Sequence, residues 1–177
     1  AIANLGITLF PLRELLQIDC IERKGGQLSL NDRMAWVDVW ALERAVREQS
    51  ASRALTPAQI EALYQGAFLQ HEEDLPWAIA PRQRLRDDLA AYVVRQVTAH
   101  LQQNRYDDAE AYCRCGLLVD DEVETFYRGI MQGRLAAGDV ETAVRTYRHC
   151  ESLLRSRHGM APGGPTREVY RQALAQR

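Results

Sequence analysis

Residues 101–109 read LQQNRYDDA and residues 135–143 read LAAGDVETA, two segments that lie 34 residues apart. This spacing is the period of tetratricopeptide helix pairs, in which a glycine or asparagine ends the first helix and a small residue lets the second helix approach closely. The equivalent positions are Val97 and Met131, Leu101 and Leu135, Asn104 and Gly138, and Ala109 and Ala143. We therefore expect two stacked helix pairs at the centre of the chain, with unrelated helical hairpins as the alternative.

Apolar residues at steps of three and four extend the helical pattern on both sides of the repeat. The expected helices cover residues 39–48, 57–66, 82–103, 106–118, 122–137 and 140–157, followed by a last helix that Thr166 caps. Between residues 66 and 81, Pro76 and Pro81 predict a loop, which Trp77 is expected to pin to a helix.

Residues 1–38 have a different pattern. A short apolar helix near residue 15 is followed by two strand-like stretches, 20–23 and 27–30, around a Gly25-Gly26 turn. Residues 35–37 are a candidate third strand, and the tryptophans at positions 36, 40 and 77 are candidate core residues. The predicted fold is mostly α: a tetratricopeptide-like, right-handed helical repeat array with a small N-terminal β-hairpin, in two domains, 1–38 and 39–177.

Composition limits the class of protein. A hydrophobic fraction of 46% predicts a globular chain, and a net charge of −2 gives no general attraction to nucleic acid. No apolar run is long enough to span a membrane and no signal peptide is visible, so a cytoplasmic location is expected. The chain starts at Ala1 on apolar residues, which predicts a fragment of a longer protein.

Motifs that carry chemistry are absent from the sequence. Nucleophile elbows, phosphate loops, paired-histidine metal motifs and dinucleotide fingerprints do not occur, and we predict a protein that is not an enzyme and needs no cofactor. Cys113 and Cys115, with His149 and Cys150 downstream, raise the question of a metal site. Their spacing matches no common zinc pattern, and residues two apart on a helix face different ways, so we expect reduced thiols at helix contacts and no metal.

One arginine-rich helix start is a candidate partner-binding surface. Arg82, Arg84 and Arg86 recur at every second position. They suit an acidic partner or a phosphate, and the favoured alternative is a solvated face on which Arg84 pairs with Asp87 or Asp88.

Four stretches of the chain together resemble a known family. They are LYQGAFL at 63–69, PWAIAPRQRLR at 76–86, AVRTYRHC at 143–150 and GMAP at 159–162. Over residues 60–176 the chain resembles the bacterial transcriptional activator domain family, the helical effector domains of transcription regulators. The resemblance implies a role in transcription. The composition of the chain does not by itself indicate such a role.

In that family an OmpR-type winged helix precedes the helical domain, and residues 1–38 resemble its end. The resemblance implies that Arg13 belongs to the end of the recognition helix and that Arg23 and Lys24 lie on the wing, all three as possible DNA contacts. Phe10-Pro11 departs from the polar or basic residues usual at that place. With the net charge of −2, this predicts weak or no DNA binding by the chain alone at physiological salt.

The leading interpretation is a fragment of a transcription regulator. The full-length protein would bind DNA, and the repeats would bind another protein, such as RNA polymerase or another domain of the regulator, or transmit a signal. The alternatives are an interaction scaffold without a DNA role and a domain that senses a small-molecule effector. Because residues 1–38 carry more apolar surface than they can bury alone, we also expect them to pack on the helical domain.

Overall fold

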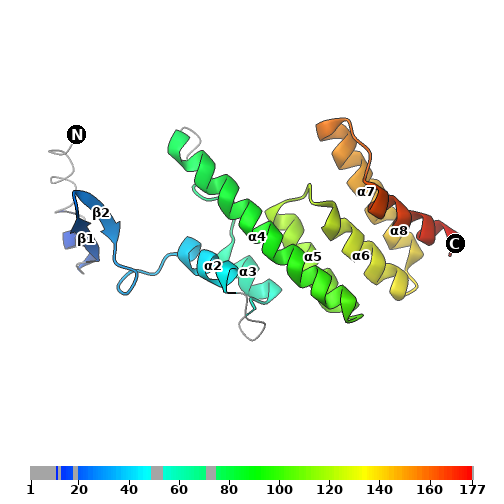
Figure 1. The fold of residues 1–177 in the computed structure, drawn as a ribbon, viewed down its shortest axis with the longest axis horizontal. Coiled ribbons are helices and arrows are strands. Elements are labelled where there is room, and N and C mark those ends of the chain that lie inside the picture. The colour runs from blue at the N-terminus through cyan, green and yellow to red at the C-terminus, as the bar shows by residue number, and fades with distance from the viewer. Residues whose placement is uncertain (1–10, 12, 18–19, 49–53, 71–74, 177) are drawn as a thin grey trace. The chain divides into compact units, whose positions relative to one another are not determined.

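The computed structural model describes residues 11, 13–17, 20–48, 54–70 and 75–176. The chain divides into two compact units, residues 1–41 and residues 42–177. The first unit contains a helical turn at residues 13–16 and a hairpin, and the second contains a helical array (Figure 1).

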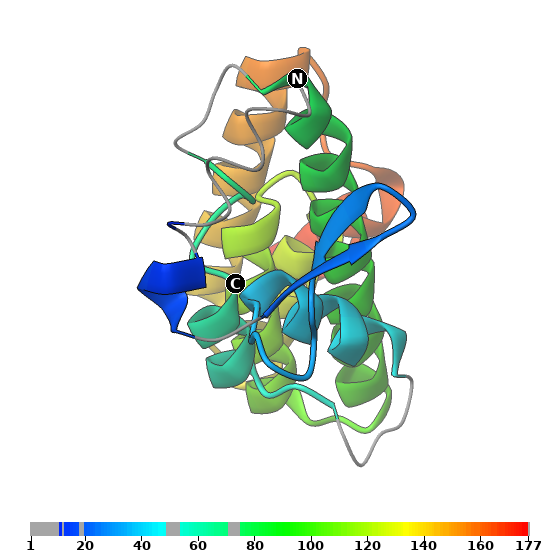
Figure 2. The same ribbon diagram turned by 90° about the vertical axis from the view of Figure 1, so that its left-hand side faces the viewer.

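The hairpin of the first unit is antiparallel. Its strands are β1 (Ile21–Lys24) and β2 (Gln27–Leu30). Ile21 lies opposite Leu30, and the two strands run side by side in both views (Figures 1 and 2). Gly25 and Gly26 have φ angles of +59° and +81°. Two consecutive left-handed residues are what a tight type I′ turn requires, so the predicted hairpin and its glycine turn are confirmed.

The third strand predicted at residues 35–37 is wrong. The chain turns at residues 32–34, and the Ala35 N–H donates to the Asn31 carbonyl at 2.9 Å, so this amide closes a turn and is not free to extend the sheet. Trp36, expected in the core, is 74% exposed. Trp40, in the helix that follows, is half-buried.

Seven helices are described after the hairpin. They are α2 (Asp38–Arg47), α3 (Pro57–Leu63), α4 (Pro76–Gln102), α5 (Tyr106–Val119), α6 (Glu124–Ala136), α7 (Val140–His158) and α8 (Gly164–Ala175). From α4 onward each helix packs on the next, and α6 contacts α4, α5, α7 and α8 (Figure 1). The expected class, mostly α with a helical repeat and a small N-terminal hairpin, is confirmed.

The two predicted repeat turns have the same backbone. Asn104 and Gly138 are left-handed, with φ of +55° and +76°. The N–H of Asn104 donates to Leu101, and the N–H of Gly138 donates to Leu135, at 3.1 and 3.0 Å. The helices that follow begin at equivalent residues, 106 and 140.

The small residues of the repeat lie where the alignment placed them. Ala109 and Ala143 are fully buried, as are the paired first-helix residues Val97 and Met131. Any larger side chain at either alanine would meet the neighbouring helix. The predicted period of 34 residues therefore describes the packing of α4–α5 and α6–α7.

The loop predicted at residues 66–81 ends earlier than expected, because α4 already starts at Pro76. Proline fits the first turn of a helix, where its missing N–H would have no intrahelical acceptor, and Pro81 removes only one later hydrogen bond. Trp77 therefore lies on a helix and is 61% exposed, with its ring edge-on to Phe68 at 6.4 Å. Trp77 packs on the preceding loop, but it is not a core residue.

The start of α8 also differs from the prediction. Gly163 is the N-cap, Pro165 lies in the first turn, and Thr166 is fully buried inside the helix. The Gly163 N–H donates to both carboxylate oxygens of Glu124, at 3.0 and 2.8 Å, so a side chain of α6 fixes this helix start. Thr166 accepts a hydrogen bond from Arg128 instead of capping the helix.

Two tyrosines bind the backbone of one residue, Leu55, in the segment before α3. The Leu55 N–H donates to the Tyr92 hydroxyl at 2.7 Å, and the Tyr112 hydroxyl donates to the Leu55 carbonyl at 2.8 Å. Tyr92 belongs to α4 and Tyr112 to α5. The segment that enters α3 is thus attached to both helices of the first pair.

The core between α6, α7 and α8 is apolar and well filled. Its buried members are Met131, Ala143, Val144, Tyr147, Val169 and Ala173. The rings of Tyr147 and Tyr170 stack at 4.0 Å and cover one side of it. None of the helices in the described part of the chain combines the length and apolarity that crossing a bilayer requires.

Candidate interaction surfaces

The tip of the hairpin carries two of the three predicted DNA contacts. Arg23 and Lys24 end β1 beside the glycine turn, and both are exposed. Arg13 is placed differently, because its guanidinium donates to the Ile21 carbonyl at 2.9 Å, at the other end of β1. The structure therefore brings Arg23 and Lys24 together and gives Arg13 a contact that ties the helical turn to the hairpin.

The three arginines at the start of α4 do not form one basic face. Arg82 donates to the backbone carbonyls of Phe68, at 2.5 Å, and Leu69, which fixes the preceding loop. Arg86 lies 3.6 Å from Asp120. Arg84 is exposed, and no ion pair joins it to a carboxylate among the described residues, so the predicted pairing with the next acidic residues does not form there. Of the three, Arg84 is the side chain best placed to meet a partner.

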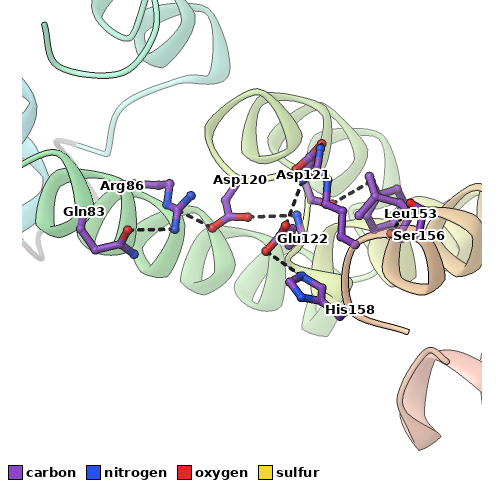
Figure 3. Close-up of polar contacts among 10 residues, drawn as sticks. Gln83, Arg86, Asp120, Asp121, Glu122, Leu153, Ser156 and His158 are labelled. Carbon is purple, nitrogen blue, oxygen red and sulfur yellow. Dashed lines mark hydrogen bonds and ion pairs between the residues drawn. The ribbon is translucent and has the colours of Figure 1, made fainter. Parts of the chain in front are cut away.

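The acidic loop between α5 and α6 binds cations from two other helices (Figure 3). Arg86 reaches Asp120 from α4, and Arg157 of α7 contacts Asp121 at 2.6 and 2.9 Å. Glu122 accepts from Arg157 at 3.0 Å and lies 3.2 Å from His158. Hydrogen bonds from these two residues lower the pKa of the Glu122 carboxyl.

No role was predicted for these acidic residues from the sequence, so their part in joining helices was missed. One signal was available. Acidic side chains directly after the C-terminus of a helix are unfavourable next to the negative end of its dipole, so they need cations from elsewhere. Asp120 and Asp121 follow α5 in this way.

A groove of about 260 Å³ lies between α5 and the end of α6. It is lined by Asp107, Glu110, Ala111, Arg114, Gly133, Arg134 and Ala137. The Glu110 carboxylate accepts two hydrogen bonds from Arg114, at 3.0 and 2.7 Å, and one from Arg134 across the groove. Burial raises the pKa of Glu110, but the hydrogen bonds from Arg134 and Arg114 outweigh it and lower the pKa below its ordinary value.

A second groove of about 470 Å³ lies between α7 and the end of α8. It is lined by Val140, Glu141, Val144, Arg145, Arg148 and Gln176. Val144 is buried, whereas Arg145 and Arg148 are exposed. The groove therefore has an apolar floor and a rim with two arginines and one glutamate.

The cysteines of the helical array do not form a metal site among the described residues. Cys113, Cys115 and Cys150 are buried, and burial raises the pKa of each thiol to about 12. The raised pKa favours the uncharged thiol of all three cysteines at neutral pH. They pack as small apolar residues, as predicted: the Cys113 sulfur lies where a Cβ on Gly129 would be.

Comparison with known families identifies the helical array. The sequence model of the bacterial transcriptional activator domain matches residues 37–174, well over half of the chain, and these residues cover α2 to α7 and all of α8 except its last residue. Neither the curated proteins nor the solved structures contain a significant match.

Proposed function

Because this chain belongs to the bacterial transcriptional activator domain family, we propose that it is part of a cytoplasmic, non-enzymatic transcription regulator. In this proposal the helical array binds a partner and the hairpin unit contacts DNA in the full-length protein. The partner is another protein, either RNA polymerase or a further domain of the same regulator.

The observation that carries this proposal is the combination of two units with different chemistry in one chain. The second unit is a stack of equivalent helix pairs, an architecture that presents extended surfaces to other proteins. The first unit exposes Arg23 and Lys24 at the tip of a hairpin with a left-handed glycine turn. Short basic hairpins suit contact with a phosphate backbone, and the resemblance of residues 1–38 to the end of a winged helix supports the same role.

Partner binding by the array falls on exposed arginines that form no ion pair among the described residues. Arg84 of α4 and the arginines of the α7 groove are exposed, whereas Arg82 and Arg86 hold the array together. Both grooves have exposed rims. A partner protein fits such open grooves better than a small effector, which usually needs a site that buries most of its surface.

A genome-wide DNA-binding assay tests the regulator function. The full-length gene product is incubated with sheared DNA of its own host, and bound fragments are sequenced. We expect discrete enriched sites, and we expect Arg23→Ala with Lys24→Ala to weaken binding to them about tenfold and to reduce the salt dependence by roughly one to two counterions. Arg33→Ala, an exposed cation outside the hairpin tip, is the matched control. Absence of enriched sites would leave an interaction scaffold as the function of the array.

A further inference from the structure

The two grooves of the array occupy equivalent places in the repeat. Four residues of α5 line the first groove, and adding 34 to each number gives four of the residues that line the second. The pairs are Asp107 and Glu141, Glu110 and Val144, Ala111 and Arg145, and Arg114 and Arg148. Each groove is completed by the end of the helix that follows in the stack. Ala137, after α6, lines the first groove, and Gln176, after α8, lines the second.

In the first groove, a side chain of the protein itself shows which type of ligand group binds there. A carboxylate, that of Glu110, lies between Arg114 on its own helix and Arg134 on the facing helix. Gly133 lies beside this carboxylate, and a Cβ there would be in ordinary van der Waals contact with it, 3.8 Å from a Glu110 oxygen. An internal ion-paired carboxylate therefore occupies the arginine site of the first groove.

In the second groove one arginine is kept and the carboxylate is lost. Arg148 stands where Arg114 stands, but Val144 replaces Glu110, and no carboxylate among the described residues forms an ion pair with Arg148. Arg145 adds a second guanidinium in place of Ala111. It donates to the neutral Thr142 hydroxyl at 3.0 Å and interacts electrostatically with the Asp139 carboxylate, but forms no ion pair within 4.0 Å of a carboxylate among the described residues. The arginine of the facing helix is also missing. Gln176 follows α8 as Ala137 follows α6, and three residues earlier α8 has Ala173 where α6 has Arg134.

We propose that the α7–α8 groove is a docking site for an acidic helical segment of a partner protein. A carboxylate of the partner binds Arg148 and Arg145, as the Glu110 carboxylate binds Arg114 in the first groove. Apolar side chains of the partner pack on Val140 and on the exposed edge of Val144. This inference rests on the proposed function, since it names the kind of partner that the array would take.

The shape and charge of the groove favour a protein segment over a free carboxylate. Its rim is formed by exposed residues, so the site is open along one side. Arg145 and Arg148 are three residues apart on α7, a spacing that places both guanidinium groups on one face. An amphipathic helix presents carboxylates and apolar residues together in the same way. Glu141 at the rim disfavours a partner with extended negative charge, so a single carboxylate beside apolar residues fits best.

The test uses a labelled synthetic helix of about twelve residues in which leucine and glutamate recur at helical spacing. Its binding to the chain is measured by fluorescence polarisation at low salt, beside the same peptide with glutamine for glutamate. We expect the glutamate peptide to bind, and we expect the glutamine peptide to bind at least tenfold more weakly. Equal binding of the two peptides, or no binding of either, would overturn the proposal.

Variants of the chain locate the site. Arg148→Gln combined with Arg145→Gln should weaken binding of the glutamate peptide about tenfold or more. Arg155→Gln, an exposed arginine of the same helix that already pairs with Glu151, should leave it unchanged. Equal losses in the two variants would show that the peptide is attracted by overall charge and not by the groove.

Val144→Glu provides a sharper test, because it rebuilds the internal carboxylate of the first groove. The new side chain should pair with Arg148, as Glu110 pairs with Arg114, and should abolish peptide binding. Val144→Gln has the same size without the charge and serves as the control for lost core packing. If both variants remain folded by circular dichroism and bind the peptide equally, the groove is not the site.

The source of the carboxylate and the proposed function are tested separately. Displacement of the peptide by millimolar succinate or free glutamate would assign the site to a small effector and overturn the docking of a protein segment. The DNA-binding assay does not depend on these results. Enriched DNA sites without peptide binding would contradict only the docking site, and peptide binding without enriched sites would contradict only the role in transcription.

Discussion

The two turns of the repeat combine the same backbone with different side chains. At the α4–α5 turn, Asn104 is the left-handed residue and Arg105 precedes the second helix without capping it. At the α6–α7 turn, Gly138 is left-handed and the Asp139 side chain caps α7 by accepting from the Thr142 N–H at 3.0 Å. Yet the residues after the two left-handed positions, Arg105 and Asp139, have nearly identical backbone angles.

This difference shows which positions define a helix pair and which are free to vary. The left-handed residue and the buried alanine are required by backbone geometry and close packing, so they recur. The charged residues around them are set by local partners. His100 and Arg134 are equivalent, for example, and one stacks on Tyr112 while the other pairs with Glu110.

The largest effect should come from filling the alanine positions. We expect Ala109→Leu and Ala143→Leu each to destabilise the chain by about 1–3 kcal/mol, because both sites are fully buried and a larger side chain overpacks them. Urea unfolding measures the change. Ala111→Leu and Ala136→Leu, on exposed surfaces of α5 and α6, should have little effect. Unchanged midpoints for both buried variants would contradict the equivalence of the two pairs.

A smaller effect should separate the two left-handed residues. Gly138→Ala is expected to cost about 1–2 kcal/mol through backbone strain alone, since a Cβ at this position meets no atom within 4 Å. Asn104→Ala should cost less, because asparagine already bears part of that strain, and Asn104→Gly should be tolerated. These differences are measured by thermal unfolding. An equal loss for Gly138→Ala and Asn104→Ala would show that the asparagine side chain contributes a contact of its own.

The tyrosines that bind Leu55 distinguish the first pair from the second. Tyr112→Phe removes a partly buried hydrogen bond to a backbone carbonyl and should destabilise the chain by about 0.5–1.5 kcal/mol. Tyr147→Phe is the control, because its ring stacks on Tyr170 and no hydrogen bond of its hydroxyl is found among the described residues. The comparison uses chemical denaturation with the slope checked for constancy. A loss as large in Tyr147→Phe would point to the aromatic packing.

The smallest effect concerns pH. Burial lowers the pKa of His100, Arg105 lowers it further, and Asp108 acts in the opposite direction. The folded pKa is therefore below the ordinary value of 6.5, the unfolded chain binds the proton more tightly, and stability falls as the pH drops below that value. His100→Gln should reduce the difference in melting temperature between pH 7.5 and pH 5. An unchanged difference would assign the acid sensitivity to other groups.

The parts of the fold that sequence predicts are those with local causes. Asn104, Gly138 and the paired glycines of the hairpin are required by φ, which depends on a few neighbouring atoms. The start of α4 was missed because a proline ends one helix and begins another equally well, and only its surroundings decide. Trp36 and Trp77 were placed in the core because they are large, but burial depends on what covers a side chain and not on its size.

The candidate surfaces were harder to predict because their partners are distant in sequence. Nothing near Arg86 indicates that Asp120 will pair with it, and nothing near Glu110 points to Arg134. The predicted set of three arginines therefore separates into two structural residues and one exposed residue. Once the 34-residue period is accepted, the sequence does contain one further signal, namely that Val144 replaces Glu110 while Arg148 retains the arginine.

The attachment of Leu55 has a mechanical consequence. Its backbone N–H is held by Tyr92 of α4 and its carbonyl by Tyr112 of α5, so tension on the chain that precedes α3 is shared between two helices. A pull on that segment would have to break both hydrogen bonds before Leu55 could leave its place. Leu55 thus acts as an anchor through which force applied to the preceding chain reaches the first helix pair.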